Sequence, residues 1–216
     1  MARLSPHLLR QLFYALLVRP VLMVLLGLNV RNLARLRAGD GAHIIAANHN
    51  SHLDALVLMS LIKLRDMKRV KLVAARDYFC RTPFLTWFSL NIIGVIPIDR
   101  QGGTDNPLAP VIQALDEGYT IVIFPEGSRG EPEKRQPLKY GVAKLLETHP
   151  HIEVTPVFMY GLGKALPRGE GLLVPFMCDI NIGERMEWPG DKARFIESLE
   201  QSFTALAQEI APKPWH

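Results

Sequence analysis

The sequence has little cysteine, and its first 39 residues contain no acidic side chain. Its two cysteines, Cys80 and Cys178, lie far apart and match no metal-binding or redox spacing, which argues against a disulfide framework and favours a reducing compartment. No G-x-S-x-G nucleophile elbow, internal repeat or low-complexity linker occurs. With 48% hydrophobic and 21% charged residues among 216, wholesale disorder is excluded and one domain with a large core is expected.

The positive charge of the chain is concentrated at its N-terminus. Six arginines fall within residues 1–39, and the rest of the chain, with 19 basic and 21 acidic residues, is nearly neutral. The longest uncharged stretch there (20–30) has eleven residues, whereas a spanning helix needs about twenty. Pro20 is expected to divide the apolar run into two short helices. Residues 1–37 therefore predict an amphipathic two-helix arm that lies on anionic lipid, with a hairpin packed on the domain and a true span as alternatives.

From residue 42 onwards, short β-rich runs alternate with helical periodicity. The alternation predicts an α/β sandwich with a largely parallel central sheet flanked by helices, formed by residues 38–216 as one domain. The expected strands are 43–48, 70–75, 94–99, 120–125, 152–159 and a run around 172–181. The expected helices are 53–64, 83–92, 107–118, 138–149 and 191–211. In such sheets the functional residues gather where strands end in loops.

Polar residues cluster directly after the first of these strands, in AANHNSHLDALVL (46–58). His49 follows the strand and Asp54 enters the next helix. A carboxylate that accepts from one imidazole nitrogen fixes the tautomer and raises the basicity of the other nitrogen. Ser51 lies too close to His49 to be an independently placed nucleophile, which suggests that a substrate hydroxyl takes the place of the serine. The alternative is structural, with Asp54 capping the helix and His49 satisfied in a loop.

Two further strand ends carry charges suited to a phosphorylated substrate. Arg100 ends GVIPIDR and is followed by glycines whose N–H groups can approach an anion. The turn FPEGSRG brings Glu126, which can accept from a substrate hydroxyl, and Arg129, which can hold a phosphate oxygen. Lys139 offers another cation at the start of a helix. The alternatives are a surface ion pair and an ordinary polar turn.

Together these blocks resemble the lysophosphatidic acid (1-acylglycerol-3-phosphate) acyltransferase family of glycerolipid synthesis, within the superfamily that carries an H-x-x-x-x-D motif. Four family blocks occur in the family order across about residues 44–160: NHNSHLD, GVIPIDR, FPEGSRG and VTPVFM. The sequence departs from the pattern at NSH after the base, where a Gln-Ser pair is common. Gly130 stands where serine is frequent, and Tyr140 where a second lysine is often found. These departures concern the acceptor rather than the chemistry.

The resemblance implies roles for individual residues. His49 would be the general base and Asp54 its orienting partner, and the acceptor hydroxyl would attack an acyl thioester directly. Glycerol phosphate binding is implied for Arg100, Glu126, Gly127, Ser128, Arg129 and Lys139. No metal or cofactor is implied, and acyl-CoA or acyl carrier protein would be the co-substrate.

The resemblance also implies partners and a location. The expected partners are a phospholipid membrane surface, a lysophospholipid acceptor and the acyl donor, with no nucleic acid. The expected location is the cytoplasmic face of the inner membrane, with the chain held there as a peripheral or monotopic protein.

Three other functions stay open from the sequence. The acceptor can be another lyso-lipid. A hydrolase, either a thioesterase or a metal phosphatase built from His49, His52, Asp54 and Glu126, would act without an acyl acceptor. A lipid-binding protein with a degenerate site would have no activity.

Overall fold

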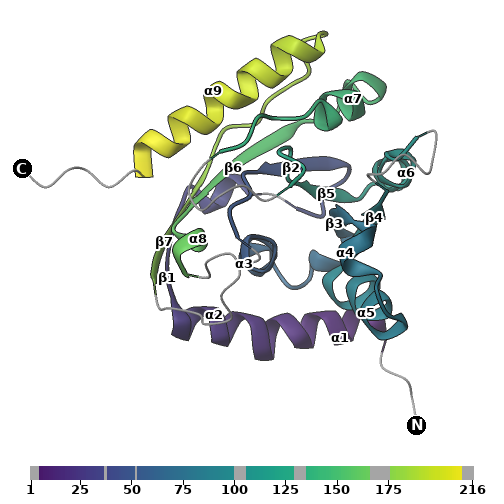
Figure 1. Ribbon diagram of the computed structural model, residues 1–216, viewed down its shortest axis with the longest axis vertical. Coiled ribbons are helices and arrows are strands. Elements are labelled where there is room, and N and C mark those ends of the chain that lie inside the picture. The colour runs from purple at the N-terminus through teal and green to yellow at the C-terminus, as the bar shows by residue number, and fades with distance from the viewer. Residues whose placement is uncertain are drawn as a thin grey trace, which may run out of the picture.

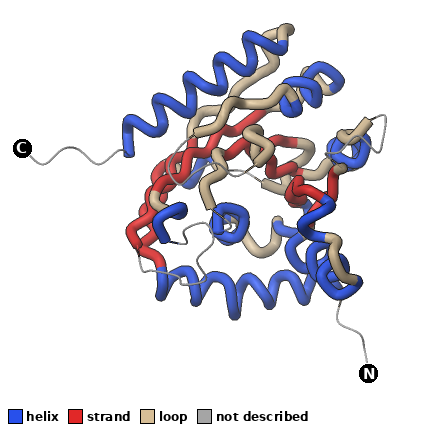
Figure 2. The backbone as a smooth tube through the Cα atoms, viewed as in Figure 1, coloured by secondary structure: helices blue, strands red, loops and turns tan. Residues whose placement is uncertain are grey.

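The protein is an α/β structure built on one sheet. The computed structural model describes residues 5–36, 38–51, 53–99, 106–128, 135–165 and 176–210. Over these residues, seven strands form a sheet in the order β1-β7-β6-β2-β5-β3-β4, with helices on both faces (Figures 1 and 2). Neighbouring strands are parallel, except for the antiparallel pair of β6 and β7. The predicted largely parallel α/β sheet is confirmed.

Six strands coincide with the predicted apolar runs. They are β2 (His43–Ala47), β3 (Val70–Ala75), β4 (Val95–Ile98), β5 (Thr120–Ile123), β6 (Val154–Tyr160) and β7 (Phe176–Ile182). A strand covered on both faces is apolar throughout rather than alternating. In β2, Ile45 and Ala47 face one hydrophobic core while Ile44 and Ala46 face the other.

The helices divide between the two faces of the sheet. The N-terminal helix (Pro6–Leu25) and α3 (Leu53–Leu61) cover one face of the sheet. The other face is covered by α6 (Ala109–Asp116), α7 (Gly141–Thr148) and α9 (Lys192–Ile210) (Figure 1). Between β3 and β4 the chain forms α4 (Arg76–Phe79), then α5 (Pro83–Phe88), which continues into the π-helical turn η4 (Ser89–Ile93). Three further short helices are η2 (Leu33–Arg35), η3 (Met67–Arg69) and α8 (Leu162–Ala165).

The N-terminal segment contains one long helix, not the two short helices predicted. Residues Pro6–Leu25 run through α1 (Pro6–Phe13), the π-helical turn η1 (Tyr14–Val18) and α2 (Arg19–Leu25). A proline removes an N–H donor and crowds the carbonyl four residues before it. The widened π turn before Pro20 accommodates this crowding, since the Arg19 N–H bonds the Tyr14 carbonyl five residues back. A π turn therefore replaces the predicted break.

The second predicted helix of the arm is a β-strand. Residues Leu26–Arg31 form β1, which pairs in parallel with β7 along the edge of the sheet. Strand formation here depends on a partner about 150 residues later in the chain, which no local pattern reveals. Part of the predicted arm therefore belongs to the central sheet.

Polar side chains attach the N-terminal helix to the domain. Arg10 is buried and donates to the carbonyls of Met67 (2.8 Å), Val70 (3.0 Å) and Ile93 (2.9 Å). Arg19 likewise donates to main-chain carbonyls at the end of α3. The prediction that the arginines face lipid is therefore wrong for these two residues, because they satisfy carbonyls left open where helices and turns end.

The exposed side of the same helix is apolar. Leu16, Met23 and Val24 are 72%, 79% and 82% exposed, and Leu17 and Val21 are also exposed. Among the described residues, Pro6–Leu25 is the one helix whose length and composition would allow it to cross a membrane.

Candidate active site

The polar residues after β2 and β5 meet at one edge of the sheet. These strands are parallel neighbours, paired from His43 with Thr120 to Ala46 with Ile123. Their carboxyl ends therefore lie side by side, which brings His49 next to the turn that starts at Phe124. The His49 ring stacks on the Phe124 ring with centroids 4.2 Å apart and planes 18° apart. Sequence reasoning did not single out Phe124, although it begins the FPEGSRG block.

His49 and Asp54 form a hydrogen-bonded pair. His49 Nδ1 lies 2.9 Å from Asp54 Oδ2, and the same oxygen accepts from the N–H groups of Asn50 (2.6 Å) and Ser51 (2.8 Å). An ionised carboxylate only accepts hydrogen bonds, so Nδ1 carries the proton and Nε2 is left as the basic nitrogen. Asp54 is fully buried, while the His49 side chain is 19% exposed and lines a cavity. The pair has the arrangement of a general base and its orienting acid.

The Ser51 hydroxyl is not placed to act as a nucleophile. Ser51 is buried, and its Oγ accepts from the Leu53 N–H at the start of α3. This contact is a helix-capping interaction. His49 thus lines the cavity, while the hydroxyl of the serine two residues later is bound at the start of α3.

Glu126 is hydrogen-bonded to the backbone of His49. It is 1% exposed, and its Oε1 accepts from the His49 N–H at 3.1 Å while Oε2 accepts from the Gln136 N–H at 3.3 Å. Burial raises the pKa of the Glu126 carboxyl, and these two backbone hydrogen bonds oppose the rise. Glu126 is buried and does not line the cavity beside His49, so it contacts the backbone of the His49 loop rather than the cavity.

Two asparagines hold the His49 loop against β6. Asn48 donates from Nδ2 to the Met159 carbonyl (2.9 Å) and accepts on Oδ1 from the Met159 N–H (2.7 Å). Asn50 donates to the same carbonyl at 3.2 Å. These side chains extend the pairing of β2 with β6 beyond the end of the strand. Sequence reasoning did not assign these roles to Asn48 and Asn50, although two amide side chains at the end of a buried strand could have indicated them.

A cavity of about 610 Å³ opens beside His49. It lies where β3 and β5 separate, since their pairing ends at Leu72 and Val122 while β3 stays paired with β4 as far as Ala75. Apolar side chains form most of its wall, including Ala55, Leu72, Phe79, Ile98, Leu108, Ile123 and Val142. Polar residues also line it, among them Asp77, Tyr78, Asp99, Ser128 and Lys139. The cavity is thus suited to an apolar chain beside His49.

Lys139 lies against the turn that follows β5. Its N–H donates to the Pro125 carbonyl at 2.8 Å, and its side chain covers Gly127. Gly127 has a φ of +74°, and an added Cβ would lie 2.9 Å from Lys139 Nζ. Glycine is therefore required both for the backbone angle and for the approach of the lysine.

The structure brings together most of the residues predicted for the site. His49 is hydrogen-bonded to both Asp54 and Glu126, and Gly127, Ser128 and Lys139 line the same cavity as His49. Arg100, Arg129 and His52 lie outside the described residues, so their predicted roles stay predictions. Within the described parts of the chain, no group of three histidine, cysteine, aspartate or glutamate side chains is placed to hold a metal ion.

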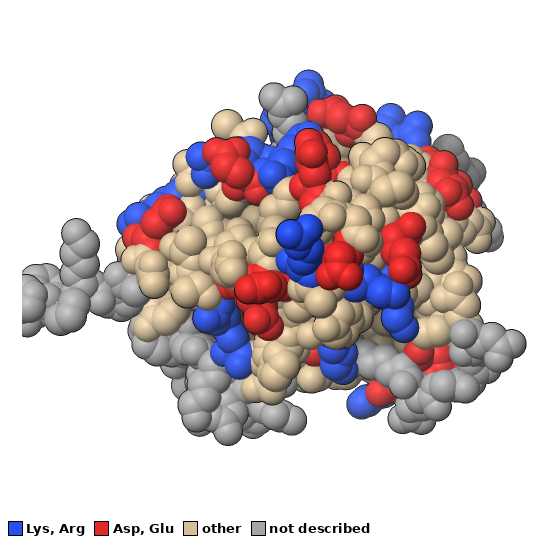
Figure 3. Space-filling model, turned by 90° about the horizontal axis from the view of Figure 1, so that it is seen from above, with Lys and Arg blue, Asp and Glu red and all other residues tan. Residues whose placement is uncertain are grey.

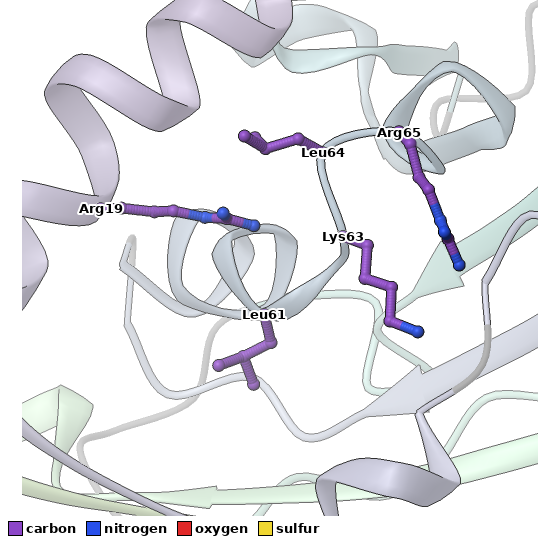
Figure 4. A pocket seen from close by; sticks show the side chains of 5 residues that line it. All are labelled: Arg19, Leu61, Lys63, Leu64 and Arg65. Carbon is purple, nitrogen blue, oxygen red and sulfur yellow. The ribbon is translucent and has the colours of Figure 1, made fainter.

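A second, basic pocket of about 410 Å³ lies at the other end of α3. Figure 4 shows Arg19 reaching from the N-terminal helix toward the loop that carries Lys63 and Arg65. The Arg19 guanidinium is bound to the Ser60 and Ile62 carbonyls. Because α3 begins at the His49–Asp54 pair and ends at this pocket, the two sites are separated by the length of the helix.

The comparisons with known proteins agree with this geometry. Residues 27–160 match the family model described as Acyltransferase. The chain is 26% identical over 170 residues to a chloroplastic 1-acyl-sn-glycerol-3-phosphate acyltransferase of Arabidopsis thaliana, a match that covers 77% of this chain and 44% of the relative. It is 31% identical over 132 residues to the enzyme of that name from Helicobacter pylori, covering 59% of this chain and 53% of the relative. The matches thus span about half the length of these relatives.

A solved structure shares the fold. The crystal structure of the 1-acyl-sn-glycerophosphate acyltransferase PlsC from Thermotoga maritima aligns with a TM-score of 0.77 at 17% identity, covering 95% of this chain and 81% of that one. At this identity the likeness concerns the fold. The family model matches more than half of the chain, and the residues it matches include the His49–Asp54 pair and the Glu126 turn. The chain belongs to the acyltransferase family.

Proposed function

We propose that the protein is an O-acyltransferase that moves a fatty acyl group from acyl-CoA or acyl carrier protein to the free hydroxyl of a lysophospholipid. The proposed acceptor is 1-acylglycerol-3-phosphate, which gives phosphatidic acid. The observation that carries this proposal is the His49–Asp54 pair, which presents a basic nitrogen to a largely apolar cavity while Ser51 is used as a helix cap. The relatives named 1-acyl-sn-glycerol-3-phosphate acyltransferase support the choice of acceptor.

The proposed reaction is a direct transfer. His49 Nε2 takes the proton of the acceptor hydroxyl as its oxygen attacks the carbonyl carbon of the thioester. The tetrahedral intermediate then collapses, the carbon–sulfur bond breaks, and the imidazolium returns the proton to the leaving thiolate. Asp54 stabilises the imidazolium during these steps. General-base assistance of this kind is typically worth about 10²–10⁴ in rate, so both substrates must also be held in register.

The other site residues are assigned to substrate binding and positioning. Lys139, on the wall of the cavity, would bind the acceptor phosphate together with Arg100 and Arg129, which the motif resemblance supplies. Gly127 and Ser128 would form the turn around the glycerol phosphate. For Glu126 we propose a positioning role through the His49 backbone in place of the substrate-binding role implied by the resemblance, because its side chain is buried, does not line the cavity and accepts from the His49 N–H.

We further propose that the protein lies on the cytoplasmic face of the inner membrane through the exposed apolar side of the N-terminal helix. The exposure of Leu16, Met23 and Val24 supports contact with a lipid surface. Arg10 and Arg19 support a fixed rather than a mobile attachment, since they tie the opposite side of the helix to the domain. The helix would then present the cavity to a lipid surface in one orientation.

Acyl transfer by the full-length chain tests the proposal. With acyl-CoA and 1-acylglycerol-3-phosphate in mixed micelles, we expect acceptor-dependent thiol release and phosphatidic acid identified by mass spectrometry. His49→Ala and Asp54→Ala should each lower kcat by about 10²–10⁴. The matched control is His149→Ala, since His149 Nε2 also lies 2.9 Å from a carboxylate oxygen, that of Asp116, but outside the cavity; it should retain activity.

Two results would contradict the mechanism. Thiol release that continues at the same rate without acceptor would identify a thioesterase. Substantial turnover in both the His49 and the Asp54 variants would exclude the proposed base, whichever acceptor is used.

A further inference from the structure

The segment between the cavity wall and β4 has an uncovered apolar side. Phe84, Trp87 and Leu90 follow one another at three-residue spacing along α5 and η4, and they are 73%, 45% and 37% exposed. Residues 82–93 contain no charged side chain. Single exposed hydrophobic residues are ordinary, but a contiguous uncharged surface that includes aromatic side chains marks an interaction site.

This surface is continuous with the N-terminal helix. Phe88 meets Phe13 edge to face with ring centroids 5.3 Å apart, and it stacks with Phe84 at 6.3 Å. On the helix itself, Leu12, which precedes Phe13 in sequence, and Leu8, one turn earlier, are exposed. Figure 1 shows α5 beside α1. The two elements therefore form one apolar surface rather than two separate patches.

The same segment is attached to the substrate cavity. Tyr78 and Phe79 of α4 line the cavity, and the hydroxyl of the buried Ser89 donates to the Phe79 carbonyl at 3.3 Å. Tyr78 is also 41% exposed, so this part of the cavity wall reaches the molecular surface. Whatever covers α5 must therefore lie next to one side of the cavity.

The lack of charge and the short length of α5 and η4 favour a lipid surface as the partner that covers their apolar side. The face that carries α9 and α7 has acidic and basic side chains interspersed over it (Figure 3), in contrast to the uncharged surface of α5. The apolar helix Pro83–Ile93 has 11 residues, which is about half the length needed to cross a bilayer. Tryptophan is favoured at the boundary between headgroups and acyl chains.

We propose that α5 and η4 form a second membrane-contacting element, which inserts Phe84, Trp87 and Leu90 into the interfacial region of the bilayer beside the N-terminal helix. This element sets the tilt of the domain and brings the cavity wall at Tyr78 to the lipid that contains the acceptor. The inference rests on the membrane location given under Proposed function, and it extends that location to a region far from the N-terminus in sequence.

Tryptophan fluorescence tests the proposal directly. In full-length protein with Trp188→Phe and Trp215→Phe, Trp87 is the single reporter. Added to vesicles of phosphatidylcholine and phosphatidylglycerol with brominated acyl chains, this protein should show a blue-shifted and quenched emission. The matched control keeps Trp188, which packs near Phe195 of α9, and replaces Trp87 and Trp215; its emission should change little on the same vesicles.

A second measurement tests the energetic contribution. Phe84→Ser with Trp87→Ser should weaken vesicle binding about tenfold or more, given the apolar area removed, while acyl transfer to detergent-dispersed acceptor is retained. Quenching of Trp87 no greater than that of Trp188 in vesicle-bound protein would overturn the proposal. A lipid-free dimer that buries Trp87 would also overturn it, in favour of a second copy. Either result with wild-type acyl transfer intact would leave the proposed function standing.

Discussion

Glu126→Gln separates positioning of the base from binding of the substrate. The glutamate carboxylate offers one oxygen to the His49 N–H and the other to the Gln136 N–H, at 3.1 and 3.3 Å. A glutamine of the same shape has one accepting oxygen and one donating NH₂ group. One of the two backbone donors must therefore face another donor in a buried site, and either the His49 loop or the segment at 136 has to move.

The magnitude follows from these contacts. A buried donor left without an acceptor costs about 1–3 kcal/mol. The substitution also removes a carboxyl whose pKa burial raises. A carboxyl whose pKa is raised in the folded protein destabilises the fold once it ionises, so stability falls as the pH rises through the folded-state pKa. Glutamine carries no charge, so the substitution removes this destabilisation and offsets part of the cost of the unpaired backbone donor. A displacement of His49 by about 1 Å is enough to lower kcat roughly 10²-fold. We therefore expect a large loss of kcat with a modest change in stability.

The assay is steady-state kinetics with the acceptor varied, together with thermal unfolding. Because the Glu126 side chain contacts the base loop, kcat should fall while KM for the acceptor stays close to the wild-type value. Asp116→Asn makes the same carboxylate-to-amide change at the His149 pair outside the cavity, and it should leave both constants unchanged. A raised acceptor KM with normal kcat in Glu126→Gln would refute the positioning role and restore a direct contact with the substrate.

Further predictions concern the core and the cavity. Burial lowers the pKa of His43 to about 4, so as the pH falls below about 6.5 the unfolded chain takes up a proton that the folded protein excludes. Between pH 7 and 4.5 the free energy of unfolding, measured in urea, should fall by about 2–3 kcal/mol more in wild type than in His43→Gln. Equal losses would contradict the burial argument. Gly94 has a φ of +83°, and an added Cβ would lie 2.6 Å from Arg10 Nη1. Gly94→Ala should therefore lower the free energy of unfolding by about 2–4 kcal/mol. The control is Gly141→Ala, which should not lower it, because an added Cβ there meets nothing within 4 Å. Lys139→Ala should raise acceptor KM about tenfold with a smaller effect on kcat, and an unchanged KM would remove Lys139 from phosphate binding.

The sequence by itself determined the elements whose residues interact locally. Strands such as β2 and β3 follow from short apolar runs, because a strand buried on both faces needs apolar side chains at every position. The His49–Asp54 pair is also local, since its members are five residues apart and Asp54 accepts from the N–H groups of Asn50 and Ser51. These contacts all lie within residues 49–54.

Only the tertiary structure decided the features that depend on distant partners. Residues 26–31 are a strand because β7 lies beside them, and strand formation depends on the neighbouring strand more than on intrinsic propensity. Arg10 faces inward because the carbonyls of Met67, Val70 and Ile93 are open to it. The bond from Glu126 to His49 spans 77 residues and exists because β2 and β5 are neighbours in the sheet. Sequence patterns report local spacing, whereas contacts between strand ends are set by the order of the strands.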